Sequence, residues 1–138
     1  MNKNQLLCFD YGLASIGVAC GNLSLGIASP LTELKAKDGI PNWTVIEQLI
    51  KEWKPSKVLV GLPLNMDGSE SELSSRARKF GNRLNGRFNI DVEMIDERLT
   101  SHAAKEQAKQ RGHRGNYKDN PIDSEAACLI LEQYFNNQ

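Results

Sequence analysis

The hydrophobic residues change their spacing near residue 40, and this change limits the folds that the chain can adopt. Three short apolar stretches separated by turn residues come first, and they predict an antiparallel meander of strands. The predicted strands cover residues 6–9, 16–20 and 25–34. Pro30 in the third stretch indicates an edge strand or a bulge.

The rest of the sequence predicts four helices and two further strands. Ser69 and Glu72 form a capping-box pattern before a helix that reaches Phe88, and Asn120 with Pro121 is typical of a helix start. The other predicted helices cover residues 42–53 and 100–111, and the strands cover 57–61 and 91–96. This order predicts a single α/β domain over residues 1–138, with parallel strand pairing after the first helix.

Composition and length are those of an ordinary globular domain. The chain has 138 residues, of which 40% are hydrophobic and 25% charged. No apolar stretch approaches the ~20 residues that span a bilayer, and the first residues do not resemble a signal peptide. The three cysteines, Cys8, Cys20 and Cys128, lie in apolar surroundings without CxxC spacing, which predicts free thiols. We therefore expect a cytoplasmic protein without a membrane partner.

The formal net charge is zero, but positive charge is concentrated in one part of the chain. Eleven of the seventeen Lys and Arg residues lie between residues 76 and 118, against five acidic residues. Four of them form a basic stripe beside the apolar stripe of a predicted helix: Arg76, Lys79, Arg83 and Arg87. This concentration favours an anionic partner, and a solvated helix face is the alternative interpretation.

Acidic residues occur where predicted elements end or begin. Asp10 ends the first strand, Asp96 and Glu97 end the last strand, and Asp123 opens the last helix. Because sites in parallel sheets gather beyond the carboxyl ends of adjacent strands, these carboxylates can converge on one edge. Carboxylates so close repel one another unless a cation bridges them. Hard oxygen ligands without a His or Cys cluster suit Mg²⁺ or Mn²⁺.

Each of these acids also has a structural interpretation. Asp10 can accept backbone hydrogen bonds in the turn that follows it. Asp96 and Glu97 can form a local ion-pair network with Arg98. Asp123 can complement the positive end of its helix. A structural role is favoured for any one acid considered alone, whereas three acids that can converge favour a metal site.

Four stretches, FDYGLASIGVA, VGLPLNMDG, DERLTS and DSEAA, resemble in this order the YqgF family, also called RuvX. The resemblance covers residues 6–135. It implies a nuclease similar to Holliday junction resolvases and implicated in maturing the precursor of 16S rRNA. It also implies a ribonuclease H-like fold, with a five-stranded mixed sheet, three of its strands antiparallel, flanked by helices. The family's acidic positions fall on Asp10, Glu97 and Asp123, but the further acid that resolvases carry after the fourth strand is missing from GLPLN, residues 61–65.

The acids and the resemblance together predict metal-dependent hydrolysis of phosphodiester bonds. Two Mg²⁺ or Mn²⁺ ions about 3.5–4 Å apart would hold the scissile phosphate. Asp10 would bridge the metals, with Glu97 and Asp123 as the remaining ligands. The residues predicted to bind nucleic acid are Arg76, Lys79, Arg83, Arg87, Arg98, Arg111 and Arg114. The residues predicted to shape the cleft are Gly12, Gly61, Pro63 and Asn65.

RNA is the favoured substrate, in 5′-end processing of pre-16S rRNA, and pre-ribosomal particles are the expected partners. One alternative is a resolvase that acts on Holliday-junction DNA. A second is a non-catalytic RNA-binding module of ribosome assembly. Asp10 and Gly12, with the small residues after them, also resemble the phosphate loop of actin-like ATPases and sugar kinases. Those proteins close two such domains on a nucleotide, and 138 residues supply only one.

Overall fold

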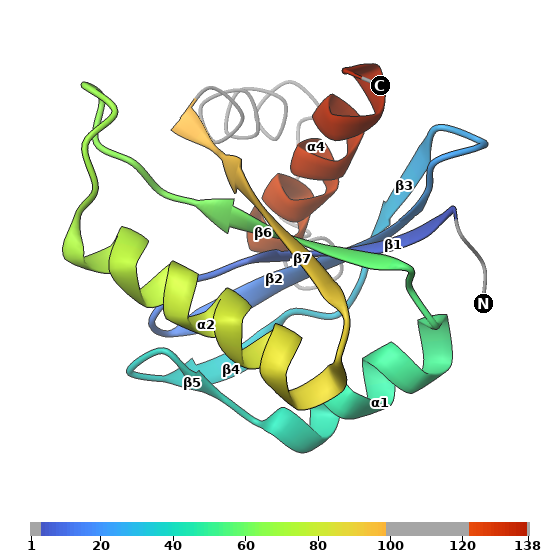
Figure 1. Ribbon diagram of the computed structural model, residues 1–138, viewed down its shortest axis with the longest axis horizontal. Helices are drawn as coiled ribbons and strands as arrows, with labels where there is room; N and C mark the ends of the chain where they lie inside the picture. The colour runs from blue at the N-terminus through green and yellow to red at the C-terminus, as the bar shows by residue number, and fades with distance from the viewer. Residues whose placement is uncertain (1–3, 99–121, 138) are drawn as a thin grey trace.

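A mixed β-sheet with helices on both faces forms the part of the chain that the computed structural model describes, residues 4–98 and 122–137 (Figure 1). The strands are β1 (Gln5–Asp10), β2 (Ser15–Asn22), β3 (Ile27–Pro30), β4 (Leu34–Lys37), β5 (Ile40–Pro41), β6 (Lys57–Leu62) and β7 (Asp91–Asp96). The helices are α1 (Trp43–Trp53), α2 (Glu72–Phe88) and α4 (Ile122–Asn136). None of these helices is long and apolar enough to cross a membrane.

The strands follow the order β5-β4-β2-β1-β6-β7, and β3 pairs with β2 beside this path. β1 pairs with β2 in the antiparallel sense, whereas β1, β6 and β7 are parallel. The carboxyl ends of three adjacent strands therefore lie at one edge of the sheet. We call this side the carboxyl edge.

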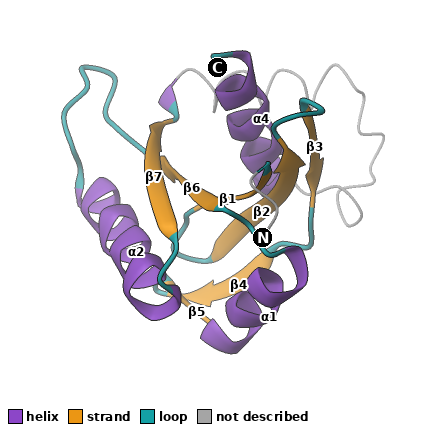
Figure 2. Ribbon diagram, turned by 45° about the vertical axis from the view of Figure 1, so that its right-hand side comes forward, coloured by secondary structure: helices purple, strands orange, loops and turns teal. Residues whose placement is uncertain are grey.

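The two faces of the sheet pack against different helices, as Figure 2 shows. Leu7 and Phe9 of β1 belong to the core beneath α1 and α2. Leu6 and Cys8 belong to the core beneath α4. Both faces of β1 are thus buried, which explains its unbroken apolar run. Because side chains alternate along a strand, Asp10 points to the α4 face.

The predicted third strand, residues 25–34, is wrong in detail, because this segment contains the separate strands β3 and β4. Both pair with β2, β3 through residues 19–22 and β4 through residues 15 and 16. Two residues of β2 lie between these two pairings, whereas three residues lie between them in the segment that connects β3 to β4. The extra residue forms a bulge. With the short strand β5, the described residues form a sheet of seven strands rather than the five expected.

A hydroxyl group from α4 occupies the gap between β3 and β4. Leu31 donates a backbone hydrogen bond to the Val18 carbonyl at 2.7 Å. The return bond is relayed by Ser124, whose Oγ accepts from the Val18 N–H at 3.4 Å and donates to the Leu31 carbonyl at 2.8 Å. Ser124 is fully buried. The helix therefore completes the hydrogen bonding of the sheet at the point where the strand is interrupted.

The capping box of α2 lies two residues beyond its predicted position. Ser71 is the N-cap, and it exchanges hydrogen bonds with Ser74 through both backbone and side-chain groups. Ser69 instead closes a turn with Asp67. The hydroxyl of Ser74 also donates to the Pro63 carbonyl, which joins the helix start to the loop after β6. The predicted helix 100–111 and the helix start at Asn120 lie outside the described residues.

Candidate active site

Asp10 and Glu97 form a hydrogen-bonded pair of carboxyl groups at the carboxyl edge. Asp10 is the last residue of β1, and Glu97 directly follows β7. The Glu97 N–H donates to the Leu62 carbonyl at 3.3 Å, so the β6–β7 ladder continues by one residue. The extended strand directs Glu97 to the α4 face, where the side chain of Asp10 also lies. Two acids that are 87 positions apart in the sequence are thereby brought together.

Gly61 of β6 provides the space that this pair occupies. A Cβ atom at this position would overlap the Glu97 carboxyl group and would lie 3.0 Å from the Ile130 side chain of α4. Any side chain here would therefore displace Glu97. The glycine lets an acid from one side of β6 reach an acid on the other side.

Burial raises the pKa of the Glu97 carboxyl group, and the charge of Asp96 raises it further. The hydrogen bond with Asp10 acts in the opposite direction. The pKa of the Cys8 thiol, at the base of the site, is raised by its own burial and then by the charges of Asp10 and Glu97. The site therefore disfavours further negative charge and favours a proton or a cation between the two carboxyl groups.

The start of α4 lies next to the same end of β1. Ser124 is bonded to Val18, and Val18 is adjacent to Gly17, the residue that pairs with Asp10 across the β1–β2 ladder. The backbone position of Asp123, one residue before Ser124, therefore belongs to the neighbourhood of Asp10. The side chain of Asp123 lies outside the described residues. Within residues 4–98 and 122–137, no three Asp, Glu, His or Cys side chains are grouped so that they could hold a metal ion.

Asp96 has a different role from its neighbour Glu97. Its carboxylate accepts hydrogen bonds from the Arg98 guanidinium at 2.7 Å, 3.0 Å and 3.1 Å, and from the Arg98 backbone N–H at 3.0 Å. These bonds hold the pKa of Asp96 below its usual range. Arg98 also donates to the Met66 carbonyl at 3.3 Å. A local ion pair is thus the structural role of Asp96, and it fastens the end of β7 to the loop after β6.

Three of the four residues predicted to shape the cleft, Gly12, Pro63 and Asn65, lie in the two loops beside the acid pair, and the fourth, Gly61, lies in β6. A Cβ at Gly12 would lie 2.6 Å from the Ser15 carbonyl oxygen, so the turn after Asp10 requires a glycine. Asn65 closes the loop after β6, because its backbone N–H and its amide both donate to Ser69. Pro63 in the same loop accepts the hydrogen bond from Ser74 of α2.

The four predicted basic residues of α2 lie away from the acid pair, whereas Arg98 directly follows Glu97. Arg76, Lys79 and Arg83 line a cavity on the α2 face of the sheet, opposite the face on which Asp10 and Glu97 meet. Arg87 stacks on Trp43, with its guanidinium carbon 4.4 Å from the ring centroid. Arg111 and Arg114 lie outside the described residues.

The sequence interpretation missed the turn that forms one wall of this cavity. Asp38 and Gly39 both have positive φ and connect β4 to β5 as a two-residue hairpin turn. The Tyr11 hydroxyl donates to the Gly39 carbonyl at 2.9 Å, and Arg76 forms an ion pair with Asp38, also at 2.9 Å. The signal was available, since Asp-Gly is a frequent sequence for such turns.

The fold is that of the ribonuclease H-like resolvases. RuvC of Thermus thermophilus, in complex with a Holliday junction substrate, superposes with a TM-score of 0.62 at 15% identity, over 96% of this chain and 94% of that one. The fowlpox virus resolvase, in complex with Holliday junction DNA, gives a TM-score of 0.56 at 12% identity, over 96% and 97% of the two chains. The predicted fold class is therefore confirmed, although the strand count differs.

The chain belongs to the RuvX family, whose model is described as Holliday junction resolvase and matches residues 4–137. A protein of Saccharophagus degradans is 56% identical over 98% of this chain and 95% of its own length. A protein of Chromohalobacter salexigens is 57% identical over 96% and 90%. Both carry the name "Putative pre-16S rRNA nuclease". The family resemblance noted from the four motifs is thus confirmed.

Proposed function

We propose that this protein is a metal-dependent nuclease that hydrolyses phosphodiester bonds in the 5′-end processing of pre-16S rRNA, in the cytoplasm. The observation that carries the proposal is the hydrogen-bonded pair of Asp10 and Glu97 at the carboxyl ends of β1 and β7, the two parallel strands that flank β6. Membership of the RuvX family and the names of its relatives support the same activity. Nucleic acid within pre-ribosomal particles is the proposed partner.

The donor set of the site fits a hard divalent cation. The carboxyl groups of Asp10 and Glu97 meet in a partly buried position, and the burial that raises the pKa of Glu97 favours neutralisation of the pair by a cation. Asp10, Glu97 and Asp123 would hold Mg²⁺ or Mn²⁺. When bound, such ions activate water and stabilise the leaving oxygen in phosphodiester hydrolysis.

The remaining residues of the site orient these ligands. Gly61 leaves room for the Glu97 carboxyl group, and the Leu62 carbonyl fixes the backbone from which Glu97 projects. Ser124 fixes the start of α4 against β2. The basic side chains of α2 would hold the phosphates of the substrate beyond the cleaved bond.

Cleavage of Holliday-junction DNA is the second candidate function, and the fold of its structural neighbours favours it. One feature of the loop after β6 disfavours it. The first acid in this loop is Asp67, and its carboxylate accepts two hydrogen bonds from Ser69 in an exposed turn. It is therefore committed to the loop structure and does not replace the acid that resolvases carry after the fourth strand.

Cleavage assays with three substrates test the proposal. Purified protein is incubated with labelled pre-16S rRNA fragment, unstructured RNA and a four-way DNA junction, each with Mg²⁺, Mn²⁺ or EDTA. We expect metal-dependent cleavage of the precursor RNA that is lost in Asp10→Asn and retained in Glu47→Gln, a matched change at an exposed ion pair. Faster cleavage of the junction would favour the resolvase. RNA binding without cleavage in any metal would favour a non-catalytic assembly module.

A further inference from the structure

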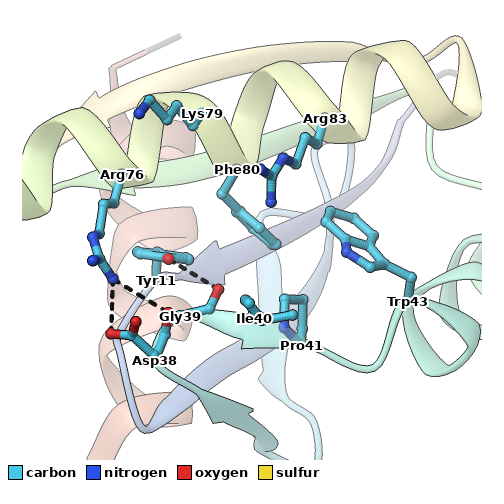
Figure 3. Close-up of a pocket in the computed structure, with 10 residues that line it drawn as sticks. All are labelled: Tyr11, Asp38, Gly39, Ile40, Pro41, Trp43, Arg76, Lys79, Phe80 and Arg83. Atoms are coloured by element: carbon cyan, nitrogen blue, oxygen red, sulfur yellow. Dashed lines mark hydrogen bonds and ion pairs between the residues drawn. The ribbon is translucent and has the colours of Figure 1, made fainter.

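A cavity of about 270 Å³ lies between α2 and the β4–β5 turn, on the face of the sheet that does not carry the acid pair (Figure 3). We call it the Arg83 pocket. Its lining combines three basic side chains, Arg76, Lys79 and Arg83, with the aromatic rings of Tyr11, Trp43 and Phe80. The volume is close to the ~300 Å³ lower end of small-molecule sites, so the pocket suits one small group.

The basic side chains of the pocket are only partly neutralised. Arg76 is paired with Asp38 at 2.9 Å, and it also lies 3.7 Å from Glu72. Lys79 and Arg83 are exposed and form no ion pair or hydrogen bond with the described residues. The guanidinium group of Arg83 extends from α2 towards the rings of Phe80 and Trp43 (Figure 3). The pocket therefore holds positive charge that an anion can neutralise.

Ring contacts and one hydrogen bond hold the aromatic wall in place. Phe80 is almost fully buried, and its ring centroid lies 5.1 Å from that of Tyr11 and 5.6 Å from that of Trp43. Tyr11 is buried as well and is fixed by its hydrogen bond to Gly39. A base or a sugar that binds in the pocket would contact rings that packing already holds in place, so its binding would cost the protein little conformational entropy.

The pocket and the acid pair share one element of the fold. Tyr11 directly follows Asp10, and the two side chains point to opposite faces of the sheet. Their Cα atoms are ~3.8 Å apart, as in any trans peptide. A single strand of nucleic acid that passes round the end of β1 would meet one site on each side of this strand end.

We propose that the Arg83 pocket binds a nucleotide next to the scissile bond, with its phosphate at Arg83 and Arg76 and its base or sugar against the aromatic wall. The inference deepens the proposed nuclease function and rests on it for the strand that delivers the nucleotide. In the free protein, the Asp38 carboxylate forms an ion pair with the Arg76 guanidinium, which the phosphate would bind instead. Asp38 is thus a competitor of the ligand.

Titration with adenosine 5′-monophosphate tests the proposal. Trp43 emission reports on the pocket in a Trp53→Phe background, because the chain has two tryptophans. Arg83→Gln should weaken binding about tenfold, the effect of losing one charge-assisted hydrogen bond. Asp38→Asn should tighten binding, since it removes the competitor. The control is Arg78→Gln, which removes the same charge from the same helix but from an ion pair with Glu70.

Several outcomes would overturn the proposal. Equal weakening by Arg83→Gln and Arg78→Gln would show diffuse electrostatic attraction, and inorganic phosphate binding as tightly as the nucleotide would exclude the aromatic wall. The nucleotide should also compete with single-stranded RNA for binding to the Asp10→Asn protein. If both bind without competition, the pocket does not bind the substrate strand. Metal-dependent cleavage is measured on the same preparations. Cleavage without nucleotide binding refutes the pocket alone, whereas nucleotide binding without any cleavage refutes the nuclease function.

Discussion

The carboxyl group of Glu97 lies against the Cα atom of Gly61, in the space that any other residue would fill with its side chain. Gly61 belongs to β6, the strand between the two that supply Asp10 and Glu97. The acid pair therefore exists because the strand between its members carries no side chain at this position. A side chain introduced at Gly61 tests this dependence.

Gly61→Ala should displace Glu97 and lower cleavage, and it should reduce the free energy of unfolding by about 1–3 kcal/mol through overpacking. Gly86→Ala is the matched control, because a Cβ at this helical position meets no atom within 4 Å. The control should stabilise the protein by about 0.5–1 kcal/mol, since alanine favours a helix over glycine. Chemical denaturation and initial cleavage rates measure both effects. A Gly61→Ala protein with normal rate and stability would contradict the described position of Glu97.

The adjacent residues Asp96 and Glu97 should change stability with opposite dependence on pH. The folded-state pKa of Glu97 is raised, so its ionisation costs stability as the pH rises above the unfolded-state value of about 4.3. Glu97→Gln should therefore stabilise the metal-free protein relative to wild type, increasingly so towards neutral pH. The folded-state pKa of Asp96 is lowered, so its contribution is present at neutral pH and is lost in acid. Asp96→Asn should be destabilising at pH 7 and neutral near pH 2, as urea denaturation in EDTA would show.

The effects of these two substitutions on activity should be the reverse of their effects on stability at neutral pH. Glu97→Gln should abolish metal-dependent cleavage, because it removes a proposed ligand. Asp96→Asn should retain most of the activity, because its carboxylate is engaged by Arg98. Single-turnover rates at saturating substrate separate chemistry from binding. A larger loss of activity in Asp96→Asn than in Glu97→Gln would show that Asp96, not Glu97, is the ligand.

Metal binding should be visible as stabilisation. A ligand that binds only the folded state contributes about 2.7 kcal/mol at a concentration one hundred times its dissociation constant. Mn²⁺ should therefore raise the melting temperature of the wild-type protein, and Asp10→Asn should lose most of this increase. Asp91→Asn, an exposed change at the opposite end of β7, should keep it. An equal response in all three proteins would place the metal elsewhere.

Ser124→Ala should destabilise the fold although it removes none of the acidic side chains of the site. It removes the hydroxyl that pairs the Val18 N–H and the Leu31 carbonyl, and buried groups left without a partner cost about 1–3 kcal/mol. Ser75→Ala on the exposed side of α2 should change the free energy of unfolding by much less. Equilibrium denaturation compares the two variants. Equal values would mean that the relay through Ser124 contributes nothing.

The elements that local periodicity specifies were predicted well. The prediction of a helix over residues 42–53 agrees with α1, and the predicted strand 91–96 agrees with β7. The approach of strand ends carrying Asp10 and Glu97 followed from the rule that parallel strands finish at one edge. These predictions needed only the spacing of apolar residues and the order of elements.

Features created by distant contacts were missed. The break between β3 and β4 depends on Ser124, which is 93 residues from Leu31. The sequence pattern predicts the helix cap at Ser69 instead of Ser71, because it does not show that Ser74 bonds the Pro63 carbonyl. The basic stripe was assigned correctly to one side of a helix, but helical spacing does not tell on which face of the sheet that helix packs.

The relay through Ser124 also has a consequence for the order in which the protein assembles. The hydrogen-bond ladder beside Val18 stays incomplete until the last helix has docked, although every strand is synthesised earlier. A chain that ends before residue 122 would thus expose the apolar face of the sheet that α4 covers and would leave the Val18 N–H and the Leu31 carbonyl unpaired. Unfinished proteins aggregate through such exposed apolar surface. Completion of the sheet and arrival of the helix that starts at Ile122 are then one cooperative step. The nascent chain should depend on protection by chaperones until its final helix is released.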